Sequence, residues 1–292
     1  MLGMSELSSE FERLRPHMTR VAYGILGSLS EAEDVVQEAW LRLQRIDVDE
    51  IEDLRGWLTT VVGRLALDAL GTARRRRETY VGEWLPEPVV DELGADPTLD
   101  ESVSTALLLV LERLSPAERT AFLLHDVFEL PFAQVAEVVG RSPAAVRQLA
   151  ARARAHVEAG KPRFPASSEE EDRVAAAFVL AWQEGDLEAL LELLDPEAVL
   201  RADGGGRVPT AAKPLRGARR IGQMLIGLAR ASARAGRGGH GRLASVNGAT
   251  GIVVEEEETT SVYSLTIDAG RIVAINVVRN PEKLAGLRPA GS

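Results

Sequence analysis

The 292-residue chain has no cysteine and only four histidines. Disulfide bonds and thiolate metal sites are therefore excluded, and a reducing compartment suits the chain. Phosphate-binding glycine loops and clusters of metal ligands are also missing, so we expect no metal and no cofactor. No uncharged apolar run approaches the ~20 residues of a membrane span, and the start, MLGMSELSSEFERLR, lacks the parts of a signal peptide. These absences predict a cytoplasmic protein that does not use a membrane.

The chain also has fewer basic than acidic residues: 34 lysines and arginines against 44 aspartates and glutamates, which gives a net charge of −10. Such a balance argues against a protein that binds nucleic acid unaided. The basic residues nevertheless cluster, at 74–77, 141–163 and 216–242. Local basic patches on an acidic body favour a protein that contacts DNA with help from a larger partner.

Residues from Phe11 to about Arg77 have helical periodicity. Ser30 followed by Glu33 predicts a capping box at the start of one helix. Behind it, apolar residues recur at helical spacing and predict one buried face and one polar face. The buried face is expected to hold Val35, Val36, Ala39, Trp40 and Leu43, and the polar face Asp34, Gln37, Glu38, Leu41 and Arg42.

A further helix begins near Arg55, after an acidic connector at 47–53. Its Trp57 could face single-stranded bases together with Thr59, Thr60 and Arg64, because stacking and charge cooperate there. Burial of the tryptophan in the core is the alternative. The helix ends in four arginines, which could hold backbone phosphates, favour the negative end of the helix dipole, or do both. They are Arg74, Arg75, Arg76 and Arg77.

A second helical block, at about 99–159, contains a helix-turn-helix pattern. Ser115 and Glu118 predict a capping box in it. A helix that ends at Gly140, a short turn and a helix capped by Ser142 follow. Side chains of this last helix could read a major groove, although an arginine-rich helix exposed on a bundle is the alternative. The candidates are Arg147, Gln148, Arg152 and Arg154.

After a linker at 160–172 the pattern changes to α+β. Helices are expected at about 171–182, 187–194 and 219–231, before an antiparallel meander of GATGIVVEEEE, TTSVYSLTID and RIVAINVVRN. A domain of this type often has a pocket, in which His240, Asp203 or Asp268 could be catalytic. Since no acid–base pair has a telling spacing, we expect no enzymatic activity.

The stretch YVGEWLPEP at 80–88, which we call the strap, is unusual for a linker. Its two prolines are incompatible with a regular helix, and a tryptophan side chain is stabilised by burial rather than by exposure to water. We therefore expect the strap to dock on another part of the molecule. Two later motifs, DGGG from Asp203 to Gly206 and NPEKL from Asn280 to Leu284, could be docking loops that allow close backbone approach. An ordinary turn and an ordinary strand exit are the alternatives.

These segments resemble a known family. AEDVVQEAWLRL and LRGWLTTVVGRLALDAL look like region 2 of the bacterial extracytoplasmic-function (ECF) sigma factors, and LERLSPAERTAFLLHDVFELPFAQVAEVVGRSPAAVRQLAARAR looks like their region 4. WLPEP, DGGG and NPEKL resemble the subgroup with a fused SnoaL-like domain of the nuclear-transport-factor-2 superfamily. The resemblance implies two all-α sigma domains followed by a cone-shaped α+β domain. The implied boundaries are 1–78 for region 2, 79–100 for the linker with the strap, 101–160 for region 4, 161–170 for a second linker and 171–288 for the SnoaL-like domain.

By this resemblance the chain would bind core RNA polymerase, at the β′ clamp helices and the β flap, and direct it to promoter DNA. Asp34, Gln37 and Glu38 would bind polymerase. The −10 element would be recognised by the loop at 47–55, Trp57, Thr60, Arg64 and Arg74 to Arg77. The −35 element would be read by Ser142, Arg147, Gln148, Ala151, Arg152 and Arg154. Two weak contacts tethered through polymerase act at a high effective concentration, which suits an acidic protein.

The resemblance also implies that the fused domain regulates initiation in cis, without a separate anti-sigma factor, by burying Trp84 and Leu85 of the strap. Arg207 and Glu282 stand where lysine and aspartate are common in the family. A small ligand of unidentified chemistry could occupy the SnoaL-like cavity. A ligand-sensing helix-turn-helix regulator that binds duplex operator DNA without polymerase is the rival interpretation, and an enzyme of the SnoaL type is a third. The implied regulatory residues are Trp84, Leu85, Pro86, Glu87, Pro88, Asp203, Gly204, Gly205, Gly206, Asn280, Pro281, Lys283 and Leu284.

Overall fold

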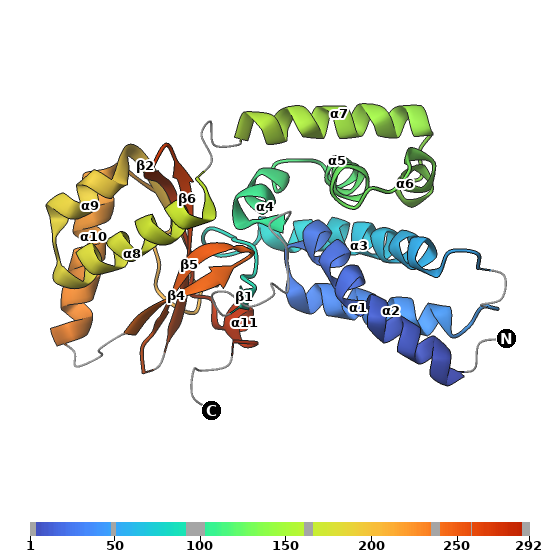
Figure 1. Ribbon diagram of the computed structural model, residues 1–292, viewed down its shortest axis with the longest axis horizontal. Coiled ribbons are helices and arrows are strands. Elements are labelled where there is room, and N and C mark those ends of the chain that lie inside the picture. Colours follow the sequence, from blue (N-terminus) through green and yellow to red (C-terminus); the bar gives the residue numbers. More distant parts are fainter. Residues whose placement is uncertain are drawn as a thin grey trace. The chain divides into compact units, whose positions relative to one another are not determined.

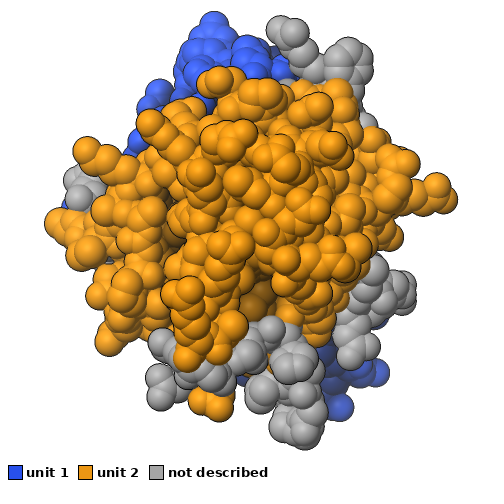
Figure 2. Space-filling model, turned by 90° about the vertical axis from the view of Figure 1, so that its left-hand side faces the viewer, with its two compact units in different colours: residues 1–78, 107–160 blue, residues 79–106, 161–292 orange. Residues whose placement is uncertain are grey.

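The computed structural model describes residues 4–47, 51–91, 103–160, 166–234, 240–257 and 259–287. The chain divides into two compact units, which Figures 1 and 2 show. Unit 1 joins Met1–Glu78 to Leu107–Gly160, and unit 2 joins Thr79–Ala106 to Lys161–Ser292. The strap, expected to be a linker between two helical domains, thus groups with the C-terminal α+β domain.

The first part of unit 1 is three helices, α1 (Met4–Leu26), α2 (Leu29–Leu43) and α3 (Leu54–Glu78), and α1 packs on both others. Their shared core is apolar, and Phe11 and Met18 of α1 are almost completely buried in it. The predicted Ser30–Glu33 capping box is wrong. Ser28 is the N-cap of α2 and accepts a hydrogen bond from the Glu31 backbone nitrogen at 3.4 Å, because the same Ser-x-x-Glu spacing occurs two residues earlier.

The second part of unit 1 is a series of shorter helices. They are α4 (Thr105–Leu111), whose first two residues belong to unit 2, α5 (Pro116–Phe122), the π-helical turn η3 (Leu123–Val127), α6 (Phe132–Val139) and α7 (Pro143–Gly160). The predicted capping box of Ser115 and Glu118 is present. Gly140, with a φ of 67°, gives α6 the left-handed end that glycine tolerates. Ser142 then accepts from the Ala145 nitrogen at 3.3 Å, so the helix-turn-helix is confirmed.

Unit 2 has two long helices, two short ones and one mixed sheet in its described part. The helices are α8 (Ser168–Glu184), α9 (Leu187–Leu193) and α10 (Ala218–Arg234), with a short α11 (Pro281–Leu284) near the end. The sheet order is β1-β4-β5-β6-β7-β2-β3. The strands are β1 (Val90–Asp91), β2 (Leu194–Asp203), β3 (Leu215–Arg216), β4 (His240–Val246), β5 (Ala249–Glu255), β6 (Thr260–Asp268) and β7 (Arg271–Val278).

The expected antiparallel meander accounts for only part of this sheet. Strands β4 to β7 do follow one another in antiparallel order, but β7 also pairs with β2 in parallel. One face of the sheet is covered by α8, α9 and α10 (Figure 1), and Leu265 and Ile275 are buried on it. Ser264 and Asn276, each one residue away, point to the opposite face because side chains alternate along a strand.

None of the helices in the described ranges combines the length and apolar character needed to cross a membrane.

Candidate functional site

The strap lies along unit 2 and continues into its sheet. Leu85, Pro86 and Pro88 are buried, whereas Val81 is 70% exposed. Directly after the strap, β1 pairs antiparallel with β4. The Asn247 nitrogen donates to the Val89 carbonyl at 2.8 Å, and the Val89 nitrogen donates back to Asn247 Oδ1 at 3.3 Å. The prolines therefore shape an extended path whose end is fixed as an edge strand.

Asp203, at the end of β2, is the centre of the strap contact. Its carboxylate is fully buried and accepts four hydrogen bonds. The Tyr80 hydroxyl donates at 2.6 Å, the Leu85 nitrogen at 3.0 Å, the Gly205 nitrogen at 3.0 Å and Lys283 Nζ at 2.7 Å. A buried carboxylate is costly unless it is paired and hydrogen-bonded, and here two of its four donors come from the strap.

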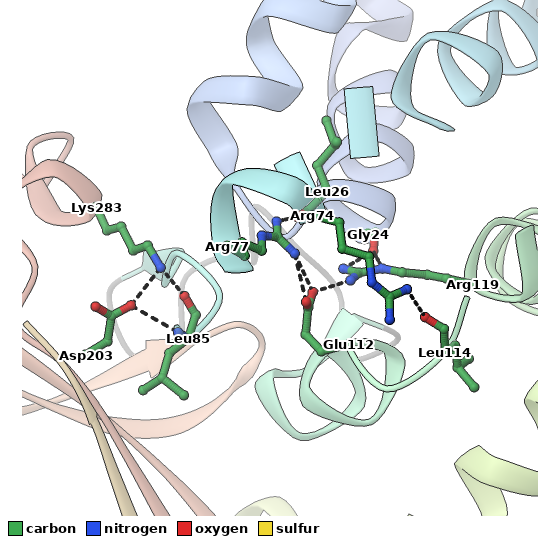
Figure 3. A network of polar contacts seen from close by, with 10 residues as sticks. All are labelled: Gly24, Leu26, Arg74, Arg77, Leu85, Glu112, Leu114, Arg119, Asp203 and Lys283. Carbon is green, nitrogen blue, oxygen red and sulfur yellow. Dashed lines mark hydrogen bonds and ion pairs between the residues drawn. The ribbon is translucent and has the colours of Figure 1, made fainter. Parts of the chain in front are cut away.

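Lys283 of α11 balances this charge. Its ammonium also donates to the Leu85 carbonyl (Figure 3). It lies 4.2 Å from the centroid of the Trp84 ring. The expectation that both Trp84 and Leu85 are buried is thus correct for Leu85 only. Trp84 remains half-buried because its ring covers a cation at the surface of the domain, which is a favourable cation–π contact.

Tyr80 and Asn280 join the strap to the NPEKL motif. Asn280 Nδ2 donates to the Tyr80 hydroxyl at 2.9 Å, and Asn280 Oδ1 caps α11 by accepting from the Glu282 nitrogen at 3.0 Å. Burial, together with the hydrogen bond to Asp203, raises the pKa of Tyr80 far above its ordinary value. The phenol is therefore held as a donor to the carboxylate.

The three glycines of DGGG permit close approach rather than free movement. A Cβ on Gly204 would lie 2.0 Å from the Val208 carbonyl oxygen, and one on Gly205 would lie 2.4 Å from Asn280 Cγ. Gly205 and Gly206 also have positive φ angles, of 64° and 71°, which glycine adopts without strain. Beyond them, Arg207 forms an exposed ion pair with Glu282. The two positions that depart from the family's usual residues therefore contact each other.

The three candidate catalytic residues do not form an acid–base site among the described residues. Asp203 is fully engaged by its donors, Asp268 lies at the β6–β7 turn, and the side chain of His240 lies outside the described part. Within the described ranges, no group of three or more acidic, histidine or cysteine side chains could hold a metal ion.

The polar face predicted for α2 is present. Asp34 and Gln37 are exposed, and Glu38 is half-buried and accepts from Arg42 Nε at 3.1 Å. The opposite face is buried as expected, except that Trp40 is half-buried and packs on Phe11 at a ring distance of 4.7 Å.

On α3, Trp57 and Thr60 are half-buried and Arg64 is exposed. Their spacing of three and four residues places them on one helix face. Thr59 faces the core instead: it is 1% exposed, donates to the Arg55 carbonyl at 2.7 Å, and lies 3.1 Å from His17 Nε2. Burial lowers the pKa of His17 to about 4, so the ring is neutral. The expectation that Thr59 faces bases is wrong for this conformation.

The arginines at the end of α3 divide into two groups. Arg75 is exposed, and the side chain of Arg76 lies outside the described part. Arg74 donates to the Leu114 carbonyl at 2.9 Å, and Arg77 pairs with Glu112 at 2.7 Å and donates to the Leu26 carbonyl. Arg74 and Arg77 thus join the two parts of unit 1, and phosphate binding by both would require this contact to open.

Glu112 also pairs with Arg119, which is 2% exposed. Arg119 in turn donates twice to the Gly24 carbonyl, at 3.0 and 3.2 Å. The cations thereby satisfy carbonyls in the last turn of α1 that have no helical partner. We call Arg77, Glu112 and Arg119 the Glu112 cluster (Figure 3).

The outer face of α7 carries the predicted base-reading residues. Arg147, Gln148, Ala151 and Arg152 are exposed, while Val146, Leu149 and Ala150 are buried against the rest of the unit. Gln148 makes no hydrogen bond within the described ranges. The α7 face that carries these residues is therefore open to solvent.

Three arginines of α7 have partners in the protein. Arg152 pairs with Glu118 at 2.8 Å, Arg154 pairs with Asp126, and the Arg147 guanidinium lies 5.2 Å from the centroid of the Phe132 ring. The hydrogen bond from Arg152, aided by Ser115, lowers the pKa of Glu118 to about 2. Glu118 is therefore ionised at neutral pH and fixes the Arg152 side chain.

We expect Gly204→Ala to destabilise unit 2 by about 1–3 kcal/mol, because the new methyl group would overlap the Val208 carbonyl. Gly227→Ala, in α10, is the matched control: its Cβ would meet nothing within 4 Å, and it should stabilise the helix by about 0.5–1 kcal/mol. Chemical denaturation measures both. Equal effects of the two substitutions would contradict the close approach.

Asp203→Asn should release the strap and lower the free energy of unfolding by about 3–5 kcal/mol. The Lys283 charge loses its partner, and the new amide NH₂, itself a donor, takes the place of an oxygen that accepts from two donors. The rate of amide hydrogen exchange in residues 79–91 should rise in this variant. Asp195→Asn, which disturbs one exposed hydrogen bond to the Glu197 nitrogen, is the control and should leave exchange there unchanged. Unchanged protection in Asp203→Asn would overturn this role.

Glu112→Gln should weaken the contact between the two parts of unit 1 by about 1–3 kcal/mol, because two cations lose their shared partner. Since the chain has no cysteine, dyes can be attached specifically at Thr72→Cys and Ala155→Cys, both on exposed helical positions. In Glu112→Gln, the distribution of energy-transfer efficiency between the two dyes should broaden toward lower values, because the two parts of unit 1 separate more often. Glu10→Gln breaks an exposed ion pair with Arg13 and should leave it unaltered; an identical distribution in both variants would contradict the prediction.

Two family models match the helical parts of the chain. Sigma-70 region 2 matches residues 11–76 and Sigma-70 region 4 matches residues 104–157. The ECF RNA polymerase sigma factor SigJ of Mycobacterium tuberculosis (strain ATCC 25618 / H37Rv) is 43% identical over 299 residues, covering 95% of this chain and 93% of the relative. The probable ECF RNA polymerase sigma factor SigI of the same strain is 35% identical over 293 residues, covering 97% and 96%.

A solved structure supports the same conclusion. The crystal structure of the Mycobacterium tuberculosis extracytoplasmic function sigma factor SigJ superposes with a TM-score of 0.78 at 39% identity, covering 96% of this chain and 98% of that one. The expected fold class, two helical sigma domains followed by an α+β SnoaL-like domain, is confirmed. With identity and shared fold both extending over nearly its whole length, the chain belongs to the ECF RNA polymerase sigma factors.

Proposed function

We propose that this chain, an alternative sigma factor that directs transcription initiation, is regulated in cis by docking of its strap on the SnoaL-like domain. The observation that carries the proposal is the fourfold binding of Asp203 with two donors from the strap. The strap is also part of the only covalent path between region 2 and region 4 in the sequence. Whatever holds or releases it changes how far those regions can separate.

The length of this path supports the proposal. A −10 and a −35 element lie about 25 base pairs apart by their names, which is about 85 Å of duplex at 3.4 Å per base pair. Residues 79–104 separate α3 from α4 and can span at most about 90 Å when fully extended. Docking of residues 80–91 takes nearly half of that path out of use. Engagement of both elements then favours the undocked strap.

For polymerase we assign the exposed polar face of α2, with Asp34, Gln37 and Glu38. The face is supported by its exposure and by the apolar packing of the opposite side of the helix. For the −35 element we assign the outer face of α7. Among its residues Ser142 sets the start of the helix, and Gln148 is exposed with no partner in the described part. The remaining −35 residues are Arg147, Ala151, Arg152 and Arg154.

For the −10 element we assign Trp57, Thr60 and Arg64 of α3, with Arg75 and Arg76 as further phosphate contacts. Arg77 would join them only after the Glu112 cluster opens, and Arg74 only after it releases the Leu114 carbonyl. The cluster therefore acts as a second constraint on initiation. No separate anti-sigma factor is required in this scheme. The SnoaL-like domain acts by binding rather than catalysis, in keeping with the full occupancy of Asp203.

Reconstituted transcription with bacterial core polymerase on a family-type promoter tests this function. We expect initiation only when the protein is added, and several-fold more product from Leu85→Ala than from the unaltered chain, because the strap loses its buried anchor. Gln148→Ala should reduce initiation, by up to about tenfold for the loss of one base contact. Gln134→Ala, a half-exposed glutamine of α6, is its control and should initiate normally.

Equal output from Leu85→Ala and the unaltered chain would overturn regulation by the strap while leaving the sigma activity intact. Binding of a duplex operator by the protein alone, without initiation by any form, would favour the rival helix-turn-helix regulator instead.

A further inference from the structure

A cavity of about 260 Å³ lies between α10 and the sheet of unit 2. Its walls are mainly apolar, with Leu200, Ala202, Met224 and Val277 among them. It is distinct from the strap contact: Asp203 follows Ala202 in β2, so its side chain points to the other face of the sheet. Leu228, one of the few large apolar side chains left exposed, at 49%, is part of the same wall.

The polar side chains of the cavity wall are Thr210, Tyr263 and Arg279, and the last two matter most as hydrogen-bond donors. The Tyr263 ring packs edge-on against Trp182 at 5.2 Å, and nothing in the described part of the chain accepts a hydrogen bond from its hydroxyl. Burial raises the pKa of Tyr263 to about 12, so the hydroxyl keeps its proton. Arg279 donates through Nε to Ser261 at 3.0 Å, while its Nη2 lies 3.7 Å from Glu256, beyond hydrogen-bonding distance.

The carboxylate of Glu256, which lies beside Arg279 and outside the cavity wall, already accepts hydrogen bonds. Ser232 donates to Glu256 Oε1 at 2.7 Å, and Thr259 donates to Oε2 at 2.9 Å. Arg279 and Glu256 also cancel each other's charge. The site thus offers unused donors, no carboxylate in its wall and no net charge, on a largely apolar surface.

We propose that this cavity binds a neutral, mostly apolar small molecule with one carbonyl-type oxygen, which accepts hydrogen bonds from Tyr263 and Arg279. At ~30 Å³ for a water-sized group, the cavity accommodates a molecule of roughly nine non-hydrogen atoms. An anion would lose its hydration close to Glu256, and a cation would meet Arg279 and no carboxylate in the wall. A neutral acceptor avoids both costs. This binding does not depend on the proposed role of the strap.

Titrations observed by saturation-transfer NMR on the full chain would test the assignment with three probes of similar size: 2-octanone, octanoate and octylamine. We expect 2-octanone to bind at least tenfold more tightly than either charged probe. Tyr263→Phe removes only the hydroxyl, and it should lower the affinity for 2-octanone about fivefold, as expected for the loss of one hydrogen bond. Because Tyr263→Phe keeps the ring, it preserves the core even if Arg279→Gln does not fold.

Arg279→Gln should lower the affinity for 2-octanone further, whereas Arg242→Gln should leave this affinity unchanged. Arg242 is the matched control, a strand arginine paired with Glu255 at 3.6 Å and absent from the cavity wall. A preference for octanoate would overturn the neutral ligand in favour of an anion. Unchanged affinity in Tyr263→Phe, or no binding of any probe at millimolar concentration, would overturn the site.

Discussion

The buried carboxylate of Asp203 is the constraint on which unit 2 depends most. An ion removed from water is stable only where opposite charge and hydrogen bonds replace its hydration. Lys283 supplies the charge, and backbone and phenol donors supply the rest. Because these donors come from three separate segments, the carboxylate can be satisfied only when the strap, the end of β2 and α11 are assembled together. The glycines after Asp203 allow these segments to approach without a side chain in the way.

Glu112 has a similar position in unit 1. Its carboxylate pairs with Arg77 and with the almost completely buried Arg119. Both arginines also donate to carbonyls at the end of α1. Apolar packing supports the contact, since a Cβ on Gly63 of α3 would lie only 3.0 Å from Leu124. The two halves of unit 1 are thus held by charge and by close helix packing at once.

The distribution of charge has a consequence for DNA affinity. Arg77, Arg152 and Arg154, all assigned to promoter contacts, are paired with acidic residues of the protein itself. In the proposed promoter complex, each of these pairs would be exchanged for a phosphate or base, which would lower the net gain in binding free energy. Together with a net charge of −10, this internal pairing predicts weak binding of free DNA. It also makes the tether through polymerase more important, because a high effective concentration offsets weak individual contacts.

The sequence by itself determined the features that depend on neighbours a few residues apart. The capping box at Ser115, the left-handed turn at Gly140, the buried face of α2 and the exposed stripe of α7 all follow from local spacing, and the motifs identified the family. Tertiary structure decided what joins residues distant in the chain. The parallel pairing of β2 with β7, the contact of Tyr80 with Asp203 across 123 positions and the engagement of Arg77 by Glu112 have no local signature. Whether a charged side chain faces solvent or a buried partner depends on which segments the fold brings beside it, and periodicity within one helix carries no information about that.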